Sequence, residues 1–80
     1  MRLDKFLKNS RIIKRRTVAR EFADSERVLI NGRIAKPSSK VSIGDLITVQ
    51  IGGKSTVYEV LDITENIRAS EAKNLYRIVE

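Results

Sequence analysis

The sequence predicts an α+β domain in which two N-terminal helices with a basic face pack on a small, mostly antiparallel β-sheet. Apolar side chains recur at helical spacing over residues 3–24. From residue 27 onward they alternate instead, with turn signals at residues 31–32, 44–45 and 52–53. The chain has 80 residues without an obvious linker or repeat, so we expect one domain over residues 1–80.

The first helix is predicted at residues 3–9. Leu3, Phe6 and Leu7 fall at positions i, i+3 and i+4, which form one apolar stripe. Asp4 lies in the first turn, where free amide groups favour a carboxylate. Residues 9–11, Asn-Ser-Arg, are expected to end the helix because Asn and Ser compete for backbone hydrogen bonds.

The second helix is predicted at about residues 15–24. Its core-facing positions would be Val18, Ala19, Phe22 and Ala23. Arg16 and Arg20 would then lie one turn apart on the flank of this apolar face, as a two-step basic ladder.

The rest of the chain is predicted to form strands. Asn31-Gly32 indicates a tight hairpin between strands near residues 28–30 and 34, and Gly52-Gly53 indicates another between residues 46–51 and 54–63. A helical turn at residues 70–73 and a last strand at 75–79 complete the prediction. Caps and turns are the expected roles of five residues: Asp4, Asn31, Gly32, Gly44 and Asp45.

Positive charge is concentrated in residues 1–20. This stretch has eight Lys or Arg residues and one acid, a net charge of +7, whereas the whole chain carries +6. Its bases alternate with apolar residues, which indicates a folded basic face for an anionic partner. The bases are Arg2, Lys5, Lys8, Arg11, Lys14, Arg15, Arg16 and Arg20.

Three of these bases crowd the start of the second helix, where the helix dipole is already positive. Lys14, Arg15 and Arg16 therefore oppose stability there but would suit a phosphate group. The alternative is that the bases are solvated and form pairs such as Arg20 with Asp24.

Composition excludes several classes of function. There is no cysteine and no histidine, which argues against metal-dependent or hydrolytic chemistry, so no catalytic residue, metal or cofactor is expected. No transmembrane segment or secretory signal is visible, and a membrane-binding helix would need a broader exposed apolar face. We expect a cytoplasmic protein with a nucleic-acid partner.

Base-stacking aromatic side chains are scarce. Phe6 and Phe22 occupy core-facing helical positions, and Tyr58 and Tyr76 are expected to complete the sheet. Contacts should therefore be mainly with phosphates and with nucleic-acid shape, as for folded RNA or non-specific duplex binding. Composition does not choose between RNA and DNA.

Five segments within residues 1–50 form a pattern in a fixed order: Arg2-Leu3-Asp4-Lys5-x-Leu7, Lys14-x-Arg16-x-x-Ala19-Arg20, Val28-x-Ile30-Asn31-Gly32, Lys36-Pro37-Ser38 and Val41-x-x-Gly44-Asp45-x-Ile47-x-Val49. Together they resemble the S4 domain, the RNA-binding domain named after small-subunit ribosomal protein four. Within this family the heat-shock ribosome-binding proteins and the RqcP group of bacterial ribosome-quality-control factors are most similar, the second group more so.

The resemblance implies a core motif at residues 1–50, followed by a C-terminal hairpin and strand at 51–80. It implies a non-catalytic factor that binds rRNA and peptidyl-tRNA on obstructed large ribosomal subunits, and we expect this factor to be a monomer. There the factor would support C-terminal alanine tailing by an RqcH-type partner. With Lys36 added from the resemblance, the predicted RNA-binding residues are Arg2, Lys5, Lys8, Arg11, Lys14, Arg15, Arg16, Arg20 and Lys36.

One position departs from the family pattern. A glycine usually follows the second helix, but Ser25-Glu26 occupies this corner, so the helix must end without it. The alternatives to the RqcP-type function are a heat-shock-type recycling factor, the RNA-binding module of a modifying enzyme, and a DNA-binding helical module.

Overall fold

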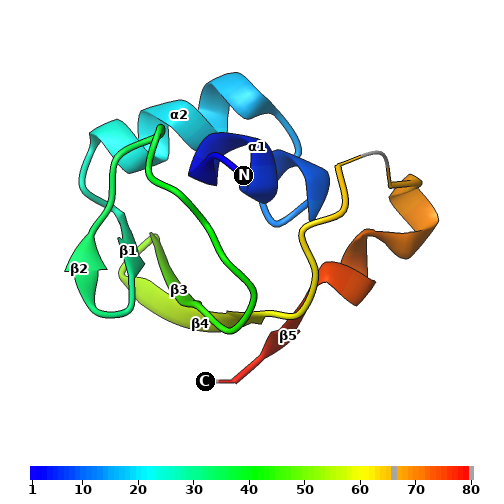
Figure 1. Cartoon of the computed structure of the whole chain (residues 1–80). Helices are drawn as coiled ribbons and strands as arrows, with labels where there is room; N and C mark the ends of the chain where they lie inside the picture. Colours follow the sequence, from blue (N-terminus) through cyan, green and yellow to red (C-terminus); the bar gives the residue numbers. More distant parts are fainter. Residues whose placement is uncertain (66, 80) are drawn as a thin grey trace.

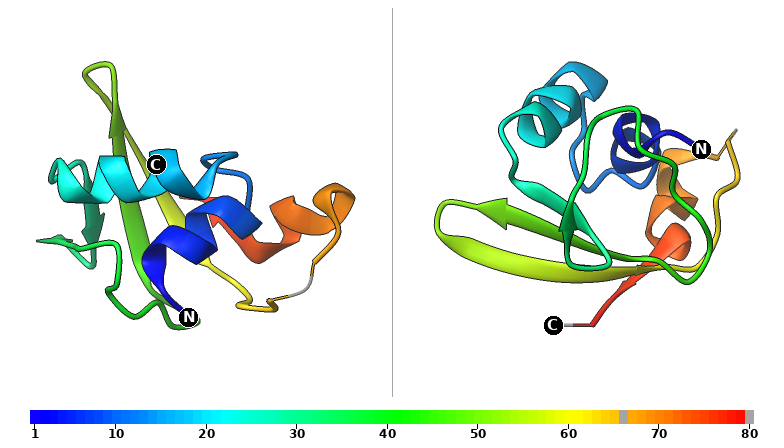
Figure 2. Two further views of the ribbon diagram at one scale, coloured as in Figure 1. Left: turned by 90° about the horizontal axis from the view of Figure 1, so that it is seen from above. Right: turned by 60° about the vertical axis from the view of Figure 1, so that its left-hand side comes forward.

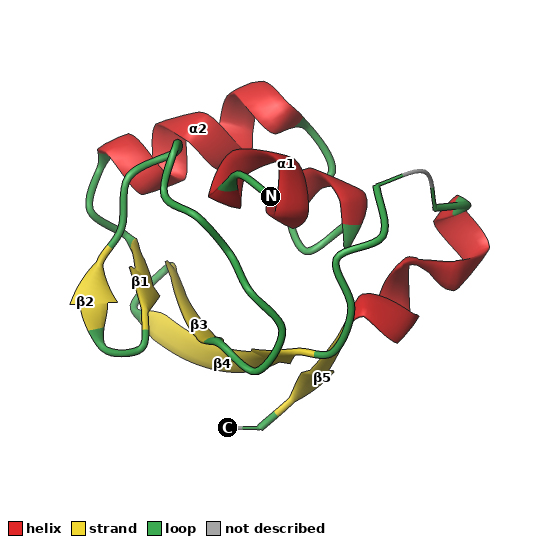
Figure 3. Cartoon of the chain, viewed as in Figure 1, coloured by secondary structure: helices red, strands yellow, loops and turns green. Residues whose placement is uncertain are grey.

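The computed structural model describes residues 1–65 and 67–79 and confirms the α+β fold. Helices α1 (Leu3–Asn9) and α2 (Arg16–Asp24) cover one face of a β-sheet, and a 3₁₀-helix, η1 (Ala69–Leu75), lies beside the sheet (Figures 1 and 3). No helix in the described part of the chain is both long enough and apolar enough to cross a membrane.

The sheet has five strands in the order β2-β1-β3-β4-β5, and every pair of neighbours is antiparallel. Sequential strands pair through the two predicted hairpins, while a long connection returns from β2 to place β3 beside β1 (Figure 3). The strands are β1 (Val28–Ile30), β2 (Arg33–Ile34), β3 (Leu46–Ile51), β4 (Lys54–Val60) and β5 (Tyr76–Ile78).

The two helices lie on one face of the sheet (Figure 2), and the hydrophobic core is formed by side chains from both layers. The predicted stripe of α1 is fully buried, since Leu3, Phe6 and Leu7 are each 0% exposed. Helix α2 contributes Ala19 and Ala23, whose small side chains let it approach the core closely. The sheet face below supplies β-branched residues such as Ile47 and Val49.

Several element ends differ from the predicted ones. Strand β4 ends at Val60 and not at residue 63, because the amides of Leu61 and Asp62 both donate to the carbonyl of Leu75 and so leave the ladder. The predicted turn at residues 70–73 extends to a 3₁₀-helix over Ala69–Leu75, which delays β5 to Tyr76. Helix α2 begins one residue late because Arg15 is extended.

The start of α1 is fastened to the β2–β3 connection. The amides of Leu3 and Asp4, which have no partner within the helix, donate to the carbonyls of Ser39 at 2.8 Å and Pro37 at 3.1 Å. The amide of Val41 donates to the carbonyl of Met1 at 2.8 Å. Residues 37–41 therefore lie against the N-terminus of α1.

The predicted structural roles of Asn31 and Asp45 are confirmed. Asn31 adopts a positive φ of 51° in the β1–β2 turn, and Gly32 follows with 81°. The Asn31 side-chain amide donates to Asp45 at 3.1 Å, and its oxygen accepts from the amide of Leu46 at 2.9 Å. The two turns at this end of the sheet are thus joined.

The aromatic rings are engaged within the fold, as the sequence predicted. Phe6 is buried, and the half-buried ring of Phe22 lies 5.4 Å from the guanidinium of Arg27. Tyr58 and Tyr76 meet edge to face at 5.2 Å between β4 and β5. None of the four rings forms an open platform for stacking bases.

Glu26, at the corner where the resemblance predicts a glycine, adopts a left-handed backbone conformation. The amide of Glu26 donates to Ala23 at 3.1 Å and that of Arg27 to Phe22 at 3.1 Å, the two bonds of a Schellman motif. Glu26 has a φ of 63°, which costs a residue with a Cβ atom about 1–2 kcal/mol. The helix therefore closes with a left-handed residue at the expense of stability.

We expect Glu26→Gly to raise the free energy of unfolding by about 0.5–1 kcal/mol, because the relief of strain exceeds the greater freedom of glycine in the unfolded chain. Chemical denaturation would measure the change. Glu26→Ala, which removes the charge but keeps Cβ, is the matched control. An equal gain for Ala and Gly would show that charge, not backbone strain, limits stability here.

Candidate nucleic-acid interface

A buried carboxylate organises the basic face. The side chain of Asp4 is 0% exposed and accepts from the backbone amide of Lys5 at 2.8 Å. Three arginines surround it: Arg2 Nη2 lies 3.3 Å from Oδ2, Arg16 Nη2 lies 3.4 Å from Oδ1, and Arg20 Nε lies 3.7 Å from Oδ2. We call these four residues the Asp4–arginine cluster.

The cluster is built from both helices. Arg2 precedes α1, whereas Arg16 and Arg20 lie one turn apart on α2, as the helical spacing predicted. Each arginine side chain stays about half exposed, at 49%, 42% and 54% in chain order. A guanidinium has five N–H donors, so each arginine can hold Asp4 and still present donors to a ligand.

The cluster keeps Asp4 ionised. Burial by itself raises the pKa of this carboxyl group, but the charge and hydrogen bond of Arg16, the amide of Lys5 and the charge of Arg2 outweigh it. The net effect is a pKa below the ordinary value of 3.8. Asp4 therefore remains a fixed negative charge that draws three cations together.

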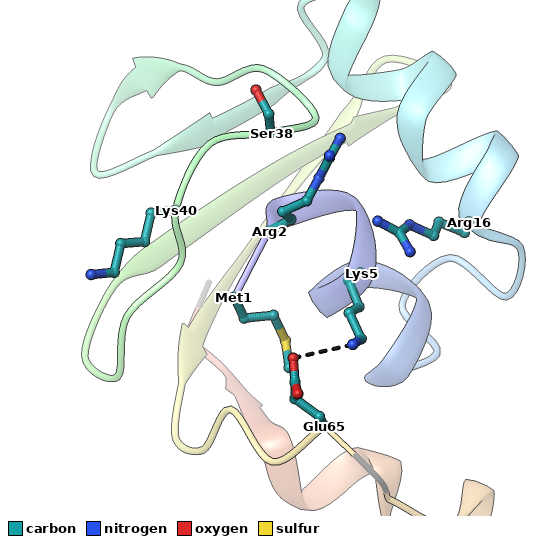
Figure 4. A pocket seen from close by; sticks show the side chains of 7 residues that line it. All are labelled: Met1, Arg2, Lys5, Arg16, Ser38, Lys40 and Glu65. Carbon is teal, nitrogen blue, oxygen red and sulfur yellow. Dashed lines mark hydrogen bonds and ion pairs between the residues drawn. The ribbon is translucent and has the colours of Figure 1, made fainter.

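A groove of about 440 Å³ opens beside the cluster (Figure 4). Arg2 and Arg16 lie toward α2, Lys5 projects from α1, and Lys40 projects from the β2–β3 connection on the other side of Met1. The groove is lined by Met1, Arg2, Lys5, Arg16, Ser38, Lys40 and Glu65.

The remaining predicted RNA-binding residues lie apart from this groove. Lys8 and Arg11 line a separate hollow with Ile67 at the other end of α1. Lys36 lines a third hollow, beside Glu26 and the C-terminal end of α2. Lys14 and Arg15 are exposed just before α2. The structure thus brings together four of the nine residues: Arg2, Lys5, Arg16 and Arg20.

Two features escaped the sequence reasoning. Lys40 reaches the groove because it pairs with Arg2 in an isolated antiparallel bridge, a long-range contact that spacing along the chain does not reveal. The sequence predicts that Asp4 stabilises the start of α1, but Asp4 also pairs with Arg20. The alternative interpretation of the sequence pairs Arg20 with Asp24 instead. A signal was present, since Asp4 is the single acid among eight bases.

The groove offers hydrogen-bond donors and positive charge. Guanidinium and ammonium groups from three segments converge there, a donor set that matches phosphate oxygens. Over residues 1–65 and 67–79, no three acidic side chains gather as a metal site. The arrangement can bind a phosphate backbone.

Asp4→Asn is expected to weaken both stability and RNA binding, although it adds one unit of positive charge to the protein. Without the carboxylate the three guanidinium groups repel one another, and we expect a loss of about 1–3 kcal/mol in the free energy of unfolding at neutral pH. Denaturation and RNA titration would measure the two effects. Tighter RNA binding would show that net charge matters more than arginine alignment.

The pH dependence of unfolding provides a second test of Asp4. Because the folded-state pKa is lowered, its stabilising contribution is present above pH 3.8 and is lost as pH falls through the folded-state value. The wild-type chain should therefore lose more stability than Asp4→Asn in acid. Parallel acid unfolding curves for the two chains would contradict the assignment.

Comparisons with known proteins show the family to which the chain belongs. The S4 domain family model matches residues 1–47. The "RQC P-site tRNA stabilizing factor" of Bacillus subtilis is 50% identical over 80 residues, covering 100% of this chain and 93% of the relative. "Heat shock protein 15" of Escherichia coli is 40% identical over 77 residues, covering 95% of this chain and 58% of that protein.

Solved structures support the same fold. The trimeric structure of Vibrio cholerae heat shock protein 15 has a TM-score of 0.89 at 39% identity, covering 99% of this chain and 81% of that one. The solution structure of the protein HP1423 has a TM-score of 0.83 at 29% identity, covering 100% and 98%. From the matched motif, the shared fold and the full-length relatives, the chain belongs to the S4 domain family.

Proposed function

We propose that the chain is a non-catalytic RNA-binding factor of ribosome-associated quality control. It binds rRNA and P-site tRNA on large ribosomal subunits obstructed by peptidyl-tRNA, and it supports alanine tailing by an RqcH-type partner. It acts in the cytoplasm as a monomer, without a metal or cofactor.

The Asp4–arginine cluster carries the RNA-binding part of this proposal. A buried acid aligns three half-exposed guanidinium groups on one face, and the adjoining groove adds Lys5 and Lys40. Rigid arginine donors suit the closely spaced phosphates of folded RNA. With the aromatic rings engaged in the fold, contacts to the backbone outweigh base stacking.

The relatives support the quality-control part. The Bacillus subtilis and Streptococcus pneumoniae relatives, both named "RQC P-site tRNA stabilizing factor", are 50% and 43% identical and are covered over 93% and 90% of their lengths. The heat-shock relative of Escherichia coli is covered over 58%. A role in recycling large subunits is therefore the second candidate.

The decisive experiment is recovery of the tagged protein from cells. We expect large-subunit rRNA, tRNA and nascent chains with C-terminal alanines to copurify, and alanine tails to be lost from cells that lack the protein. Large subunits without tailed chains would favour the recycling role. Copurification of DNA in place of RNA would overturn the proposal.

Lys5 and Lys40 are the best positions for testing the groove. Neither belongs to the Asp4–arginine cluster, so Lys5→Ala/Lys40→Ala should lower RNA affinity while leaving unfolding almost unchanged. With four or five phosphate contacts, the wild-type plot of log affinity against log salt should have a slope of about −4, less steep by about 1–2 in the variant. Titration at several salt concentrations measures both quantities.

Lys54→Ala/Lys73→Ala is the matched control. It removes the same charge from exposed positions in β4 and η1, outside the groove. If both double variants lose affinity equally, the protein binds RNA through its net charge and not through the groove.

A further inference from the structure

One acidic side chain lies in the otherwise basic groove. Glu65 lines it together with Arg2, Lys5, Arg16 and Lys40, and its Oε1 lies 3.1 Å from Lys5 Nζ (Figure 4). An RNA phosphate entering the groove would bind the same ammonium group of Lys5. The structure of the free chain therefore already contains an anion at a position where a phosphate is expected.

Helix α1 holds Glu65 by two separate contacts. Lys5 binds the carboxylate, and the Asn9 side-chain amide donates to the backbone carbonyl of Glu65 at 3.0 Å. Lys5 and Asn9 are four residues apart and so lie on the same side of α1. The backbone contact does not require the carboxylate, so removing the charge of Glu65 leaves this anchor in place.

The carboxylate is placed so that a stronger anion can displace it. The side chains of Lys5 and Glu65 are 36% and 61% exposed, and an ion pair of this exposure is weak and salt-sensitive. Among the described residues Glu65 forms its one ion pair with Lys5, whereas a phosphate in the groove could reach donors from several side chains.

We propose that Glu65 occupies the place of an RNA phosphate in the free protein and is displaced from Lys5 when RNA binds. The inference rests on the proposed RNA binding and adds a residue that sets its selectivity. A ligand with few phosphates gains too little to displace Glu65, whereas a folded RNA that engages the whole groove displaces it readily. Glu65 thus disfavours short or weakly charged ligands.

Displacement has a signature in the salt dependence. When RNA binds the wild-type chain, Lys5 gives up the Glu65 carboxylate and takes up an RNA phosphate. Its positive charge is already matched before RNA binds, so this contact adds less to the salt dependence than a contact from an unpaired lysine would. In Glu65→Gln, Lys5 is unpaired and contributes fully. The slope of log affinity against log salt should then become steeper by up to about 0.7–0.9, the value for one phosphate contact.

The test compares Glu65→Gln with Glu71→Gln by titration of a labelled RNA stem-loop at several salt concentrations. Glu71 lies in η1, outside the groove, and its substitution by Gln removes the same charge as Glu65→Gln. We expect Glu65→Gln to bind about two- to five-fold more tightly, the range for one exposed ion pair, with the steeper slope. Glu71→Gln should change affinity less than two-fold and leave the slope unchanged.

A double-mutant cycle separates displacement from simple repulsion. If Glu65 competes for Lys5, then Lys5→Gln costs more affinity in the Glu65→Gln background than in the wild-type chain. Equal costs, or equal gains from Glu65→Gln and Glu71→Gln, would overturn the inference while RNA binding stands. Failure of the wild-type chain to bind the stem-loop would instead overturn the proposed function, and the inference with it.

Discussion

The buried carboxylate of Asp4 is the interaction on which this molecule depends. A carboxylate without access to water must be matched by positive charge, and here the match comes from residues before α1 and along α2. The same contacts that pack the two helices together also set the direction of the guanidinium groups. Stability and the proposed RNA recognition therefore depend on one cluster, and a substitution at Arg2 or Arg16 would report on both.

The sheet and its loops hold this cluster in place. The amides at the start of α1 are satisfied by residues 37–39, and the turns of β1–β2 and β3 are joined by Asn31 and Asp45. The bonds to residues 37–39 hold the β2–β3 connection against α1, beside the basic face. Glu26, in contrast, lowers stability, because the corner after α2 requires a left-handed backbone conformation that a residue with a side chain does not favour.

The sequence predicted what depends on local periodicity. The apolar stripe of α1, the Arg16–Arg20 ladder and the Asn31-Gly32 turn all follow from neighbours within a few residues. What it missed depends on distant contacts. Lys40 meets Arg2 across the fold, Glu65 returns to α1, and β4 ends early because its neighbours bond to Leu75. Such contacts depend on how the elements pack around the core, and the spacing of residues along the sequence does not predict that packing.

The fastening of Met1 has a practical consequence for anyone who handles this protein. Its carbonyl accepts from the amide of Val41 and its side chain lines the groove, so a polypeptide fused to the amino terminus would start beside the groove. A fusion following β5 leaves instead from an edge strand whose end lies on the side of the sheet away from the helices (Figure 1). An affinity label placed after β5 therefore keeps the basic face unobstructed, whereas an amino-terminal label would stand at its entrance.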